Sequence, residues 1–357
     1  MKISVVRAEQ LTGTQIAAWA AIQEAEPALE SPYFRPEFTQ LVAAAKGGVE
    51  VAVLEDGGTP AGFFPFERDR SRIGRPVGWP MCDYQGVVAR AGLAWDAARL
   101  VRACGLSAWD FDHVPAGQSG FGPHARGTTG SPYLDLSAGY EAYKDGRKRA
   151  GTDLVRRTAQ SVRRLEREVG RIRFEYHTGD PTVFAKLLAW KRDQYHRTGA
   201  RDIFALAWPV RLLEAVLAAT APTFQGVVSA LYAGDRLAAI ELGIRSGGVL
   251  HSWFPAYDTE LRRFSPGMIH QFELARAAAA DGVRRIDLGK GDEEYKLRLM
   301  SGAVPLIEGS VAVTARTRLL RGGWYRARDW AKTSRFAGPV RTAARATRTL
   351  REWLSFR

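Results

Sequence analysis

Alternating hydrophobic and polar residues mark the second half of the chain as a series of hairpins. Three strand-like runs are separated by the tight-turn sequences Gly234-Asp235 and Ser246-Gly247-Gly248. An amphipathic helix with a Pro-Gly start follows, and Gly282 ends it. The predicted order is β-α-α-β-β-β-α-β, with strands at 171–177, 226–232, 237–244, 249–254 and 285–288 and helices at 181–197, 210–219 and 266–281.

The first half shows a looser version of this order, without a residue-level repeat. Thr12 or Thr14 is a candidate N-cap for its first helix, and the Gly-, Ser- and Thr-rich stretch 115–131 is predicted to be a loop. One long, arginine-rich helix is predicted from 141 to 169 and contains the domain boundary. The other predicted elements are strands at 2–6, 49–54, 61–66, 108–114 and 133–136 and helices at 11–23, 36–45 and 93–104.

The chain has 357 residues, which is enough for about two domains with separate cores. Cys82 and Cys104 are its only cysteines, which argues against a disulfide framework or a multi-cysteine metal site. The first residues lack the apolar run of a signal peptide, and no run of about 18 apolar residues predicts a membrane span. We therefore expect a reducing, cytoplasmic location and no metal.

The net charge of +13 comes from two segments, 147–173 and 316–357, because the remaining residues are slightly acidic. Both segments favour an anionic partner such as lipid headgroups, nucleic acid or a charged substrate. Residues 340–354 have the pattern of a basic amphipathic helix, with Trp353 and Phe356 at its end. This pattern is typical of attachment to an anionic membrane surface; nucleic-acid contact and docking on an acidic partner are the alternatives.

The helix start Ser265-Pro266-Gly267 is a candidate anion site. Free N–H groups and the positive end of the helix dipole bind phosphate or pyrophosphate at such a start, although an ordinary capped helix can begin in the same way. The candidate ligands of a pyrophosphate are Arg262, Arg263, Ser265 and the N–H groups of Gly267 and Met268.

Several short motifs follow one another along the chain, namely Ser31–Phe38, Gly78–Gly86, Trp190–Tyr195 with Thr198-Gly199, Pro255–Asp258, Ser265–Gly267 and Asp287–Lys296. In their order and spacing, the chain resembles the GNAT acyltransferase superfamily over residues 1–312. The closer resemblance is to the CelD/BcsL group of acetyltransferases linked to cellulose biosynthesis, itself similar to the FemAB peptidyltransferases. One departure concerns the usual phosphate loop, Arg/Gln-x-x-Gly-x-Gly/Ala, of which Arg262–Gly267 keeps the basic entry and one glycine.

The resemblance implies an α/β (α+β) fold with two tandem GNAT-like domains. Each is expected to be a mixed, mostly antiparallel twisted sheet flanked by helices. The expected divisions are an N-terminal domain at 1–145, a connecting helix at 146–170, the acyltransferase domain at 171–314 and a basic tail at 315–357. Acetyl-CoA or another acyl-CoA is the expected donor, bound by the second domain. A FemAB-like protein would instead use an aminoacyl-tRNA.

Acyl transfer requires a held donor, a polarised carbonyl and a base for the acceptor. A splayed strand ending at Phe254 can supply a backbone N–H to the carbonyl. Glu241 and His251 are candidate bases, with a paired buried carboxylate and a core histidine as the alternative interpretations. Lys296 matches the lysine that ends this loop in FemAB-like proteins, which implies a substrate-facing cation. Tyr295 is a candidate proton donor or a packing residue.

Further polar and aromatic side chains are candidate contacts for the acceptor. Asp287 ends a strand, where it is expected to anchor the following loop, and Asp292 belongs to an acidic trio that binds a sugar hydroxyl or is simply solvated. Trp190 and other tryptophans can stack on sugar rings, although most tryptophans belong to cores. The remaining candidates, for which packing or solvation is the alternative, are Asp83, Tyr84, Gln85, Lys191, Tyr195 and Tyr257.

The leading functional hypothesis is an acyl-CoA-dependent N- or O-acyltransferase, with acetyl as the expected group. It would act on a sugar, polysaccharide or cell-envelope precursor by direct transfer with help from a general base. The alternatives are a FemAB-like transferase that uses aminoacyl-tRNA and a non-catalytic scaffold at the membrane surface. Residues 316–357 would attach the protein to an anionic inner membrane face.

Overall fold

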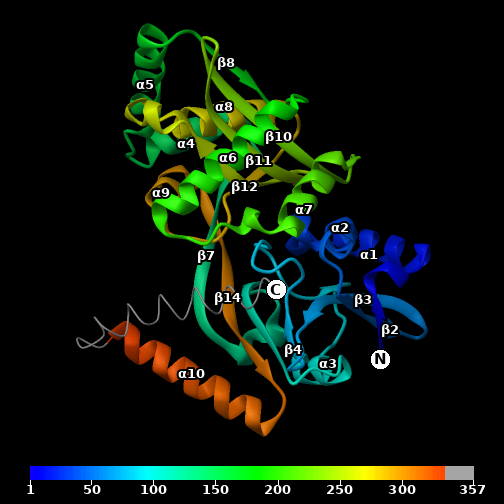
Figure 1. Ribbon diagram of the computed structural model, residues 1–357. Helices are drawn as coiled ribbons and strands as arrows, with labels where there is room; N and C mark the ends of the chain where they lie inside the picture. The colour runs from blue at the N-terminus through cyan, green and yellow to red at the C-terminus, as the bar shows by residue number, and fades with distance from the viewer. Residues whose placement is uncertain (334–357) are drawn as a thin grey trace.

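The computed structural model describes residues 1–333 as a mixed α/β fold built on one 14-stranded sheet (Figure 1). The sheet is mostly antiparallel, and helices flank it, which confirms the predicted fold class. Its strands lie in the order β1-β2-β3-β4-β6-β14-β7-β13-β12-β11-β10-β8, with β5 beside β3 and β9 beside β10. Their bounds are β1 Lys2–Arg7, β2 Val49–Asp56, β3 Thr59–Arg68, β4 Ile73–Arg75, β5 Val88–Ala89, β6 Ala108–Pro115, β7 Ala125–Asp135, β8 Ile172–Glu175, β9 Thr220–Ala221, β10 Phe224–Ala233, β11 Arg236–Ser246, β12 Val249–Tyr257, β13 Arg285–Asp287 and β14 Gly302–Ala312.

Local signals in the first half produce the helices and the hairpin that they predict. Thr12 accepts a hydrogen bond from the Gln15 N–H at 3.2 Å, and the Gln15 side chain accepts one from the Thr12 N–H at 2.9 Å. This capping box begins the first helix. The Gly57-Gly58 turn joins β2 to β3 through two residues with positive φ. The helices of this half are α1 Gly13–Ala25, α2 Pro36–Lys46 and α3 Ala97–Ala103.

In the second half, β10, β11 and β12 form the two predicted hairpins, and β13 pairs with β12 in parallel. The crossover between β12 and β13 runs through α8, which follows the Ser-Pro-Gly start. Helices α6 and α7 also have nearly the predicted bounds. The helices of this half are α4 Tyr140–Arg149, α5 Leu154–Glu168, α6 Pro181–Thr198, α7 Ala207–Ala218, α8 Pro266–Ala280, α9 Glu294–Leu299 and α10 Ala315–Thr333.

The prediction of one helix from 141 to 169 is wrong, because the chain breaks it into α4 and α5. Gly151 adopts a φ of +73°, a left-handed conformation that ends helices and favours glycine. Thr152 then donates its hydroxyl to the Arg147 carbonyl at 2.9 Å, and α5 begins after Asp153. The sequence Gly151-Thr152-Asp153 thus ends α4 and precedes the first residue of α5.

Two long strands, β7 and β14, connect the halves of the sheet (Figure 1). β7 includes residues 125–131, which were predicted to be loop, and β14 was not predicted at all. β14 pairs with β6 on one side and β7 on the other, while β7 pairs with β13. Residues from the end of the second half therefore complete the sheet of the first half.

A shared core also joins the halves. One cluster of buried side chains includes Trp19 and Phe63 from the first half together with Leu213 and Ile240 from the second. Where α2 packs against α7, the Arg211 guanidinium donates to the Ala45 carbonyl at 2.6 Å. The continuous sheet and the shared core together hold the two halves in one arrangement.

No helix within residues 1–333 is long and apolar enough to cross a membrane. The basic segment predicted at 316–357 begins as α10, which ends at Thr333. The predicted amphipathic helix at 340–354, with Trp353 and Phe356, lies outside the described residues.

Candidate active site

β12 separates from β13 after three residue pairs, the last of which is His251 with Asp287. On the other edge, the register with β11 shifts, because Leu242 faces Phe254 whereas Gly243 faces Ser252. Trp253 is therefore the extra residue of a β-bulge, which bends the strand away from its neighbour. The Trp253 indole donates to the Met81 carbonyl at 2.8 Å, so the loop 79–86 of the first half lies beside the bulge. The point where β12 separates from β13 is the centre of the candidate site.

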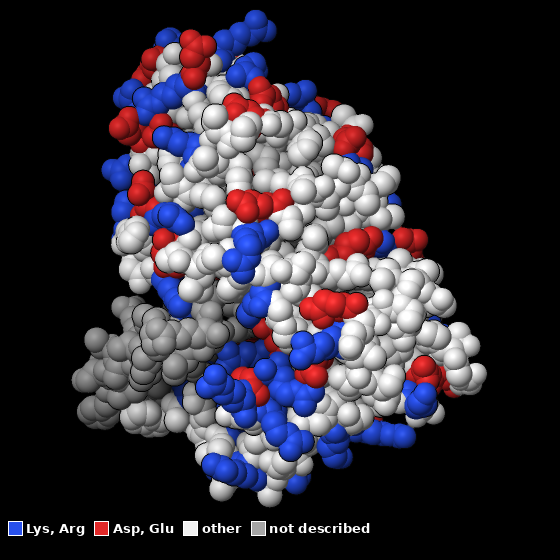
Figure 2. Space-filling view, turned by 45° about the vertical axis from the view of Figure 1, so that its right-hand side comes forward, with Lys and Arg blue, Asp and Glu red and all other residues white. Residues whose placement is uncertain are grey.

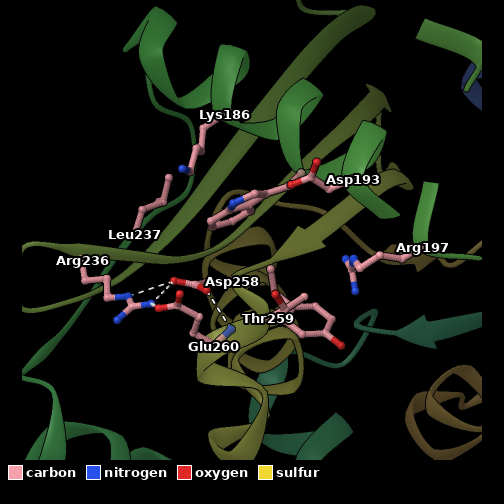
Figure 3. A pocket seen from close by; sticks show the side chains of 10 residues that line it. Lys186, Asp193, Arg197, Arg236, Leu237, Asp258, Thr259 and Glu260 are labelled. Atoms are coloured by element: carbon pink, nitrogen blue, oxygen red, sulfur yellow. Dashed lines mark hydrogen bonds and ion pairs between the residues drawn. The ribbon is translucent and has the colours of Figure 1, made fainter. Parts of the chain in front are cut away.

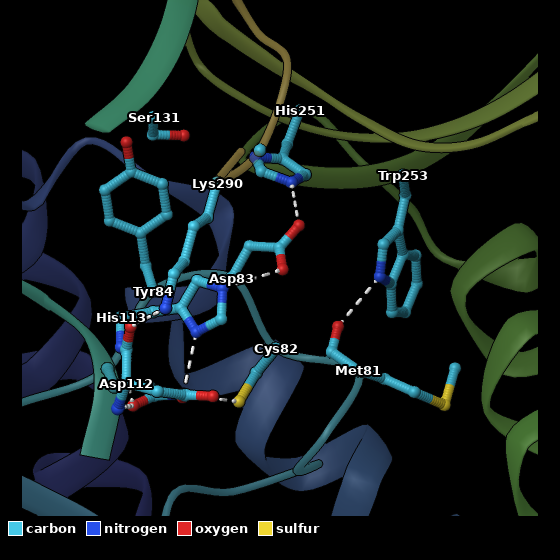
Figure 4. A network of polar contacts seen from close by, with 12 residues as sticks. Met81, Cys82, Asp83, Tyr84, Asp112, His113, Ser131, His251, Trp253 and Lys290 are labelled. Atoms are coloured by element: carbon cyan, nitrogen blue, oxygen red, sulfur yellow. Dashed lines mark hydrogen bonds and ion pairs between the residues drawn. The ribbon is translucent and has the colours of Figure 1, made fainter. Parts of the chain in front are cut away.

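Alternating carboxylates and imidazoles line the junction of the two halves (Figure 4). His251 Nε2 lies 2.8 Å from Asp83 Oδ2, and Asp83 Oδ1 lies 3.6 Å from His113 Nε2. The other ring nitrogen of His113, Nδ1, lies 2.8 Å from Asp112 Oδ1. Burial raises the pKa of Asp83, but the hydrogen bond and charge of His251, with the charges of His113 and Lys296, bring that pKa below its ordinary value. Asp83 is therefore a carboxylate at neutral pH.

Asp287 anchors this junction from the end of β13. Its carboxylate accepts hydrogen bonds from the Tyr84 hydroxyl at 2.5 Å, the Ser131 hydroxyl at 2.6 Å and the Gly289 N–H at 2.9 Å. Its Oδ1 also lies 3.5 Å from His251 Nδ1. Burial and the Asp287 charge raise the pKa of Tyr84 well above its ordinary value, so this hydroxyl stays a donor. One carboxylate thus joins three strands and the loop of the first half.

Glu241 lies in the middle of β11, opposite Pro255 on β12, and is fully buried. Its Oε2 accepts a hydrogen bond from the Gln271 amide of α8, whereas its Oε1 is buried without a partner. Burial raises the pKa of Glu241 to about 7, although hydrogen bonds from Ser252 and Gln271 act in the opposite direction. A carboxylate with this pKa can both take up and release a proton near neutral pH.

Lys191 reaches the same strand from α6 and is also buried. Its Nζ donates to Gln194 Oε1 at 3.0 Å and to the carbonyl of Pro255 at 3.4 Å. Burial lowers the pKa of Lys191 to about 8, and the nearby charge of Glu241 partly offsets this effect. Tyr195, another candidate contact on α6, packs against Phe204 with ring centroids 6.0 Å apart. Phe254 packs against the same Phe204 ring, at 5.4 Å.

Lys296 holds the acidic loop after β13 through contacts with three of its residues. The Lys296 ammonium donates to the carbonyl of Lys290 at 2.9 Å and that of Gly289 at 3.3 Å, and it pairs with Glu293 at 3.2 Å. Asp292 is exposed, and its side chain forms no hydrogen bond or ion pair within residues 1–333. Burial raises the pKa of Tyr295, as do the charges of Glu241, Glu293 and Asp83. Lys296 and Tyr295 therefore lie at the candidate site, whereas Asp292 points to solvent.

The start of α8 has the features of an anion site, with fewer ligands than predicted. Ser265 has a φ of 54°, and its carbonyl accepts the Met268 N–H at 2.9 Å, so that amide is occupied. The Gly267 N–H has no hydrogen-bond partner within residues 1–333. Arg262 is exposed without an ion pair in this part of the chain, whereas Arg263 pairs with Glu168 of α5 at 2.9 Å. Gly267 and Arg262 are thus the available groups.

A cavity of about 550 Å³ lies next to this helix start (Figure 3). One wall is a single face of α6, because its residues are spaced i, i+4, i+7 and i+11. The other wall is held by Arg236, which pairs with Asp258 and Glu260. Tyr257 links the cavity to α8, because a Cβ on Gly267 would lie 3.6 Å from the Tyr257 ring. The lining residues are Lys186, Trp190, Asp193, Arg197, Arg236, Leu237, Tyr257, Asp258, Thr259 and Glu260.

Several residues of the site were not among the predicted ones. Asp112 and His113 lie within β6, and only the fold shows that His113 lies beside Asp83 and that Asp112 pairs with His113. Gln85 was predicted, and it tethers this strand by accepting the Asp112 and His113 N–H groups at 3.0 and 3.1 Å. Gln271 had one available signal, since it and His270 are polar residues among the otherwise apolar buried residues of α8. Within residues 1–333, no group of three or more His, Cys, Asp and Glu side chains is arranged to hold a metal ion.

Residues 153–297 match the family described as an acetyltransferase (GNAT) domain. No curated protein sequence matches the chain.

Solved structures of similar fold include FemX, at 10% identity and a TM-score of 0.56, covering 89% of this chain and 98% of FemX. The C-terminal domain of a proposed lysylphosphatidylglycerol synthetase from Agrobacterium fabrum has 12% identity and a TM-score of 0.54, covering 87% and 95%. At these identities the likeness shows a shared fold. The chain thus contains a GNAT-fold acetyltransferase domain, and the protein is an acyltransferase.

Proposed function

We propose that the protein transfers an acyl group, acetyl in the simplest case, from acyl-CoA to an amine or hydroxyl of a sugar, polysaccharide or cell-envelope precursor. The observation that carries this proposal is the position of Glu241 beside the β12 bulge. Glu241 has a pKa of about 7 and an oxygen without a hydrogen-bond partner, directly across from the strand that separates from β13. A general base is most effective with a pKa near the working pH.

The donor would be held by the start of α8 and the open edge of β12. Gly267 offers a free N–H at the positive end of the helix dipole, and Arg262 adds a charge nearby. Backbone N–H groups along β12 beyond Ser252 could polarise the acyl carbonyl.

Glu241 and Lys191 would divide the proton transfers between them. The acceptor nitrogen or oxygen forms a bond to the acyl carbon and gives its proton to Glu241. The carbon–sulfur bond breaks, and the leaving thiolate takes a proton from Lys191. Both groups lie near Pro255 of β12. Pro255 pairs with Glu241 in the sheet, and its carbonyl accepts a hydrogen bond from Lys191. No covalent enzyme intermediate is involved.

The acceptor would lie in the cavity between α6 and the end of β12. Trp190 and Tyr257 offer ring faces for a sugar, and the carboxylate of Asp193 has no ion pair within residues 1–333. Such a mixture of aromatic and polar side chains is suited to a polar ring with several hydroxyls.

This assignment predicts a narrow pH optimum. Because Glu241 must be ionised and Lys191 protonated, kcat/KM should rise up to about pH 7 and fall above about pH 8. The Lys191→Met variant should lose the alkaline limb, keep the acid limb and lower kcat by about 10- to 100-fold. Lys148→Met, an exposed lysine of α4, is the control and should keep both limbs. A Lys191→Met enzyme with an unchanged profile would contradict the assignment.

Donor binding is tested by calorimetric titration with acetyl-CoA. The wild-type chain should bind, and Gly267→Ala should bind at least about ten-fold more weakly, because the added Cβ obstructs a phosphate at the free N–H. The substitution itself should not destabilise α8, since that Cβ would meet only ordinary contact with Tyr257. Gly13→Ala, at the start of α1 with open space around it, is the matched control. No binding by the wild type at millimolar acetyl-CoA would exclude this donor.

Aminoacyl-tRNA is the second candidate donor. Two observations favour it: the fold shared with FemX, and the exposed arginines of α5, among them Arg156, Arg157 and Arg167. Charged tRNA should then bind with an affinity that falls steeply with salt, and Arg156→Glu/Arg157→Glu should weaken it. Turnover of acetyl-CoA in the absence of tRNA would reject this donor. Absence of turnover with either donor would favour a non-catalytic scaffold.

A further inference from the structure

Arginines from three distant parts of the sequence gather around residues 105–107. The Arg72 guanidinium donates to the Gly105 carbonyl at 2.8 Å, and the Arg72 carbonyl accepts the Ser107 N–H at 2.8 Å. The Ser107 carbonyl in turn accepts the Thr317 hydroxyl at 2.9 Å, which fixes the start of α10 at the same place. We call this surface the basic patch; it comprises Arg68, Arg70, Arg72, Arg102, Arg316 and Arg318.

Most of the charge of the basic patch is uncompensated. Arg70, Arg102, Arg316 and Arg318 are exposed and form no ion pair within residues 1–333. Three nearby carboxylates are already engaged: Glu50 by Arg68, Asp110 by Arg321, and Asp69 by the turn amides of Ser71 and Ile73. Lysine and arginine side chains accordingly gather on the lower part of the molecule in the face shown in Figure 2. An anionic partner would relieve this accumulation of like charge.

Large apolar side chains lie beside the basic patch on the same helix. Leu319 is 70% exposed, Leu320 59% and Trp324 42%. The inner face of α10 is fastened to the sheet by ion pairs from Arg321 to Asp110 at 2.6 Å and from Arg328 to Glu308 at 2.9 Å. The leucines therefore remain on the outside of a helix whose orientation is fixed. Exposed leucines and tryptophans beside arginines are typical of helices that lie in a membrane interface.

We propose that the basic patch and the outer face of α10 dock on the surface of an anionic lipid bilayer. The arginines would meet the headgroups, and Leu319 and Leu320 would enter the boundary of the acyl chains. A nucleic acid would satisfy the arginines equally well, but it offers no apolar environment for the two leucines. The proposal is independent of the acyl donor, because the docking surface shares no residue with the candidate active site.

Co-sedimentation of the full chain with vesicles tests this inference. In 0.1 M NaCl the wild type should bind vesicles of phosphatidylcholine with about 30% phosphatidylglycerol at least ten-fold more tightly than pure phosphatidylcholine. Arg70→Glu/Arg102→Glu and Leu319→Ser/Leu320→Ser should each weaken binding to the anionic vesicles about ten-fold or more. Arg156→Glu/Arg157→Glu on α5 makes the same change of charge elsewhere and should alter binding less than two-fold.

Three results would overturn the proposal. The first is unchanged vesicle binding by the first two double variants, which would leave attachment to other parts of the chain. The second is binding to an RNA that Arg70→Glu/Arg102→Glu abolishes and Leu319→Ser/Leu320→Ser does not, which would identify a nucleic-acid surface. The third is a wild-type dimer in size-exclusion chromatography that Leu319→Ser/Leu320→Ser converts to a monomer. Thermal unfolding should show that both variants remain folded, because all four positions are exposed.

Discussion

Replacing Glu241 by glutamine is expected to lower kcat by about 10²- to 10⁴-fold and at the same time to stabilise the fold. The rate falls because glutamine cannot take up the acceptor's proton. Stability rises because ionised Glu241 is fully buried, with one oxygen unpartnered, while glutamine keeps an acceptor for the Gln271 amide. A pKa raised from 4.5 to about 7 corresponds to roughly 3 kcal/mol against the ionised form.

The gain in stability should depend on pH with a defined sign. The folded pKa of Glu241 exceeds the unfolded one, so the contribution of Glu241 to wild-type stability declines as pH rises from about 4.5 to about 7. The free energy of unfolding of Glu241→Gln should therefore match the wild type near pH 4.5 and exceed it by a constant amount above about pH 7. Urea unfolding at several pH values measures this difference. Glu214→Gln, on the exposed side of α7, is the control.

The test of Glu241 requires both the loss of activity and the gain in stability. A loss of activity without stabilisation would indicate that Glu241 is already stabilised as a carboxylate by contacts in the folded chain. Stabilisation with full activity would show that Glu241 is not the base, and His251 with Asp83 would become the next candidate, since its ring lies 2.8 Å from that carboxylate. The stability–activity trade-off that is common at catalytic sites predicts that Glu241→Gln is both less active and more stable than the wild type.

Features that depend on neighbouring residues could be predicted from the sequence. The capping box at Thr12, the Gly-Gly and Gly-Asp hairpins and the Ser-Pro-Gly start of α8 all form within a few residues. Of the candidate site, Glu241, His251 and Lys296 lie in or beside such elements. Their places on these elements could be predicted for this reason, although their mutual distances could not.

Pairings between distant strands could not be predicted in this way. β14 contains Pro305 and two glycines, and its long pairing with β7 joins residues about 170 positions apart. The Asp83 and His251 contact, which spans 168 positions, exists only because that sheet brings the loop 79–86 to the β12 bulge. His113 then follows from the place of β6 beside β14. Such contacts depend on register, and a short sequence window contains no information about register.

Replacing Asp287 by alanine should destabilise the protein by roughly 3–5 kcal/mol. The side chain is buried and accepts three hydrogen bonds, from Tyr84, Ser131 and Gly289. Two of these donors, the Tyr84 and Ser131 hydroxyls, would be left in the interior without an acceptor, and such groups retain the full cost of desolvation. His251 would also lose the carboxylate 3.5 Å from its Nδ1.

The position of Asp287 between the halves makes the effect distinguishable from ordinary core damage. Asp287→Asn retains an oxygen for the Ser131 hydroxyl and the Gly289 N–H but loses the charge, so it should cost about half as much. Val283→Ala, in the core cluster that includes Ile286 and Leu288 on either side of Asp287, is a control that should cost about 1–3 kcal/mol without affecting the junction. Hydrogen exchange should accelerate in the loop after β13 for Asp287→Ala and remain unchanged for Val283→Ala. If the loop is equally protected from hydrogen exchange in both variants, Asp287 is not its anchor. The contacts of Lys296 with Gly289 and Lys290 must then hold the loop instead.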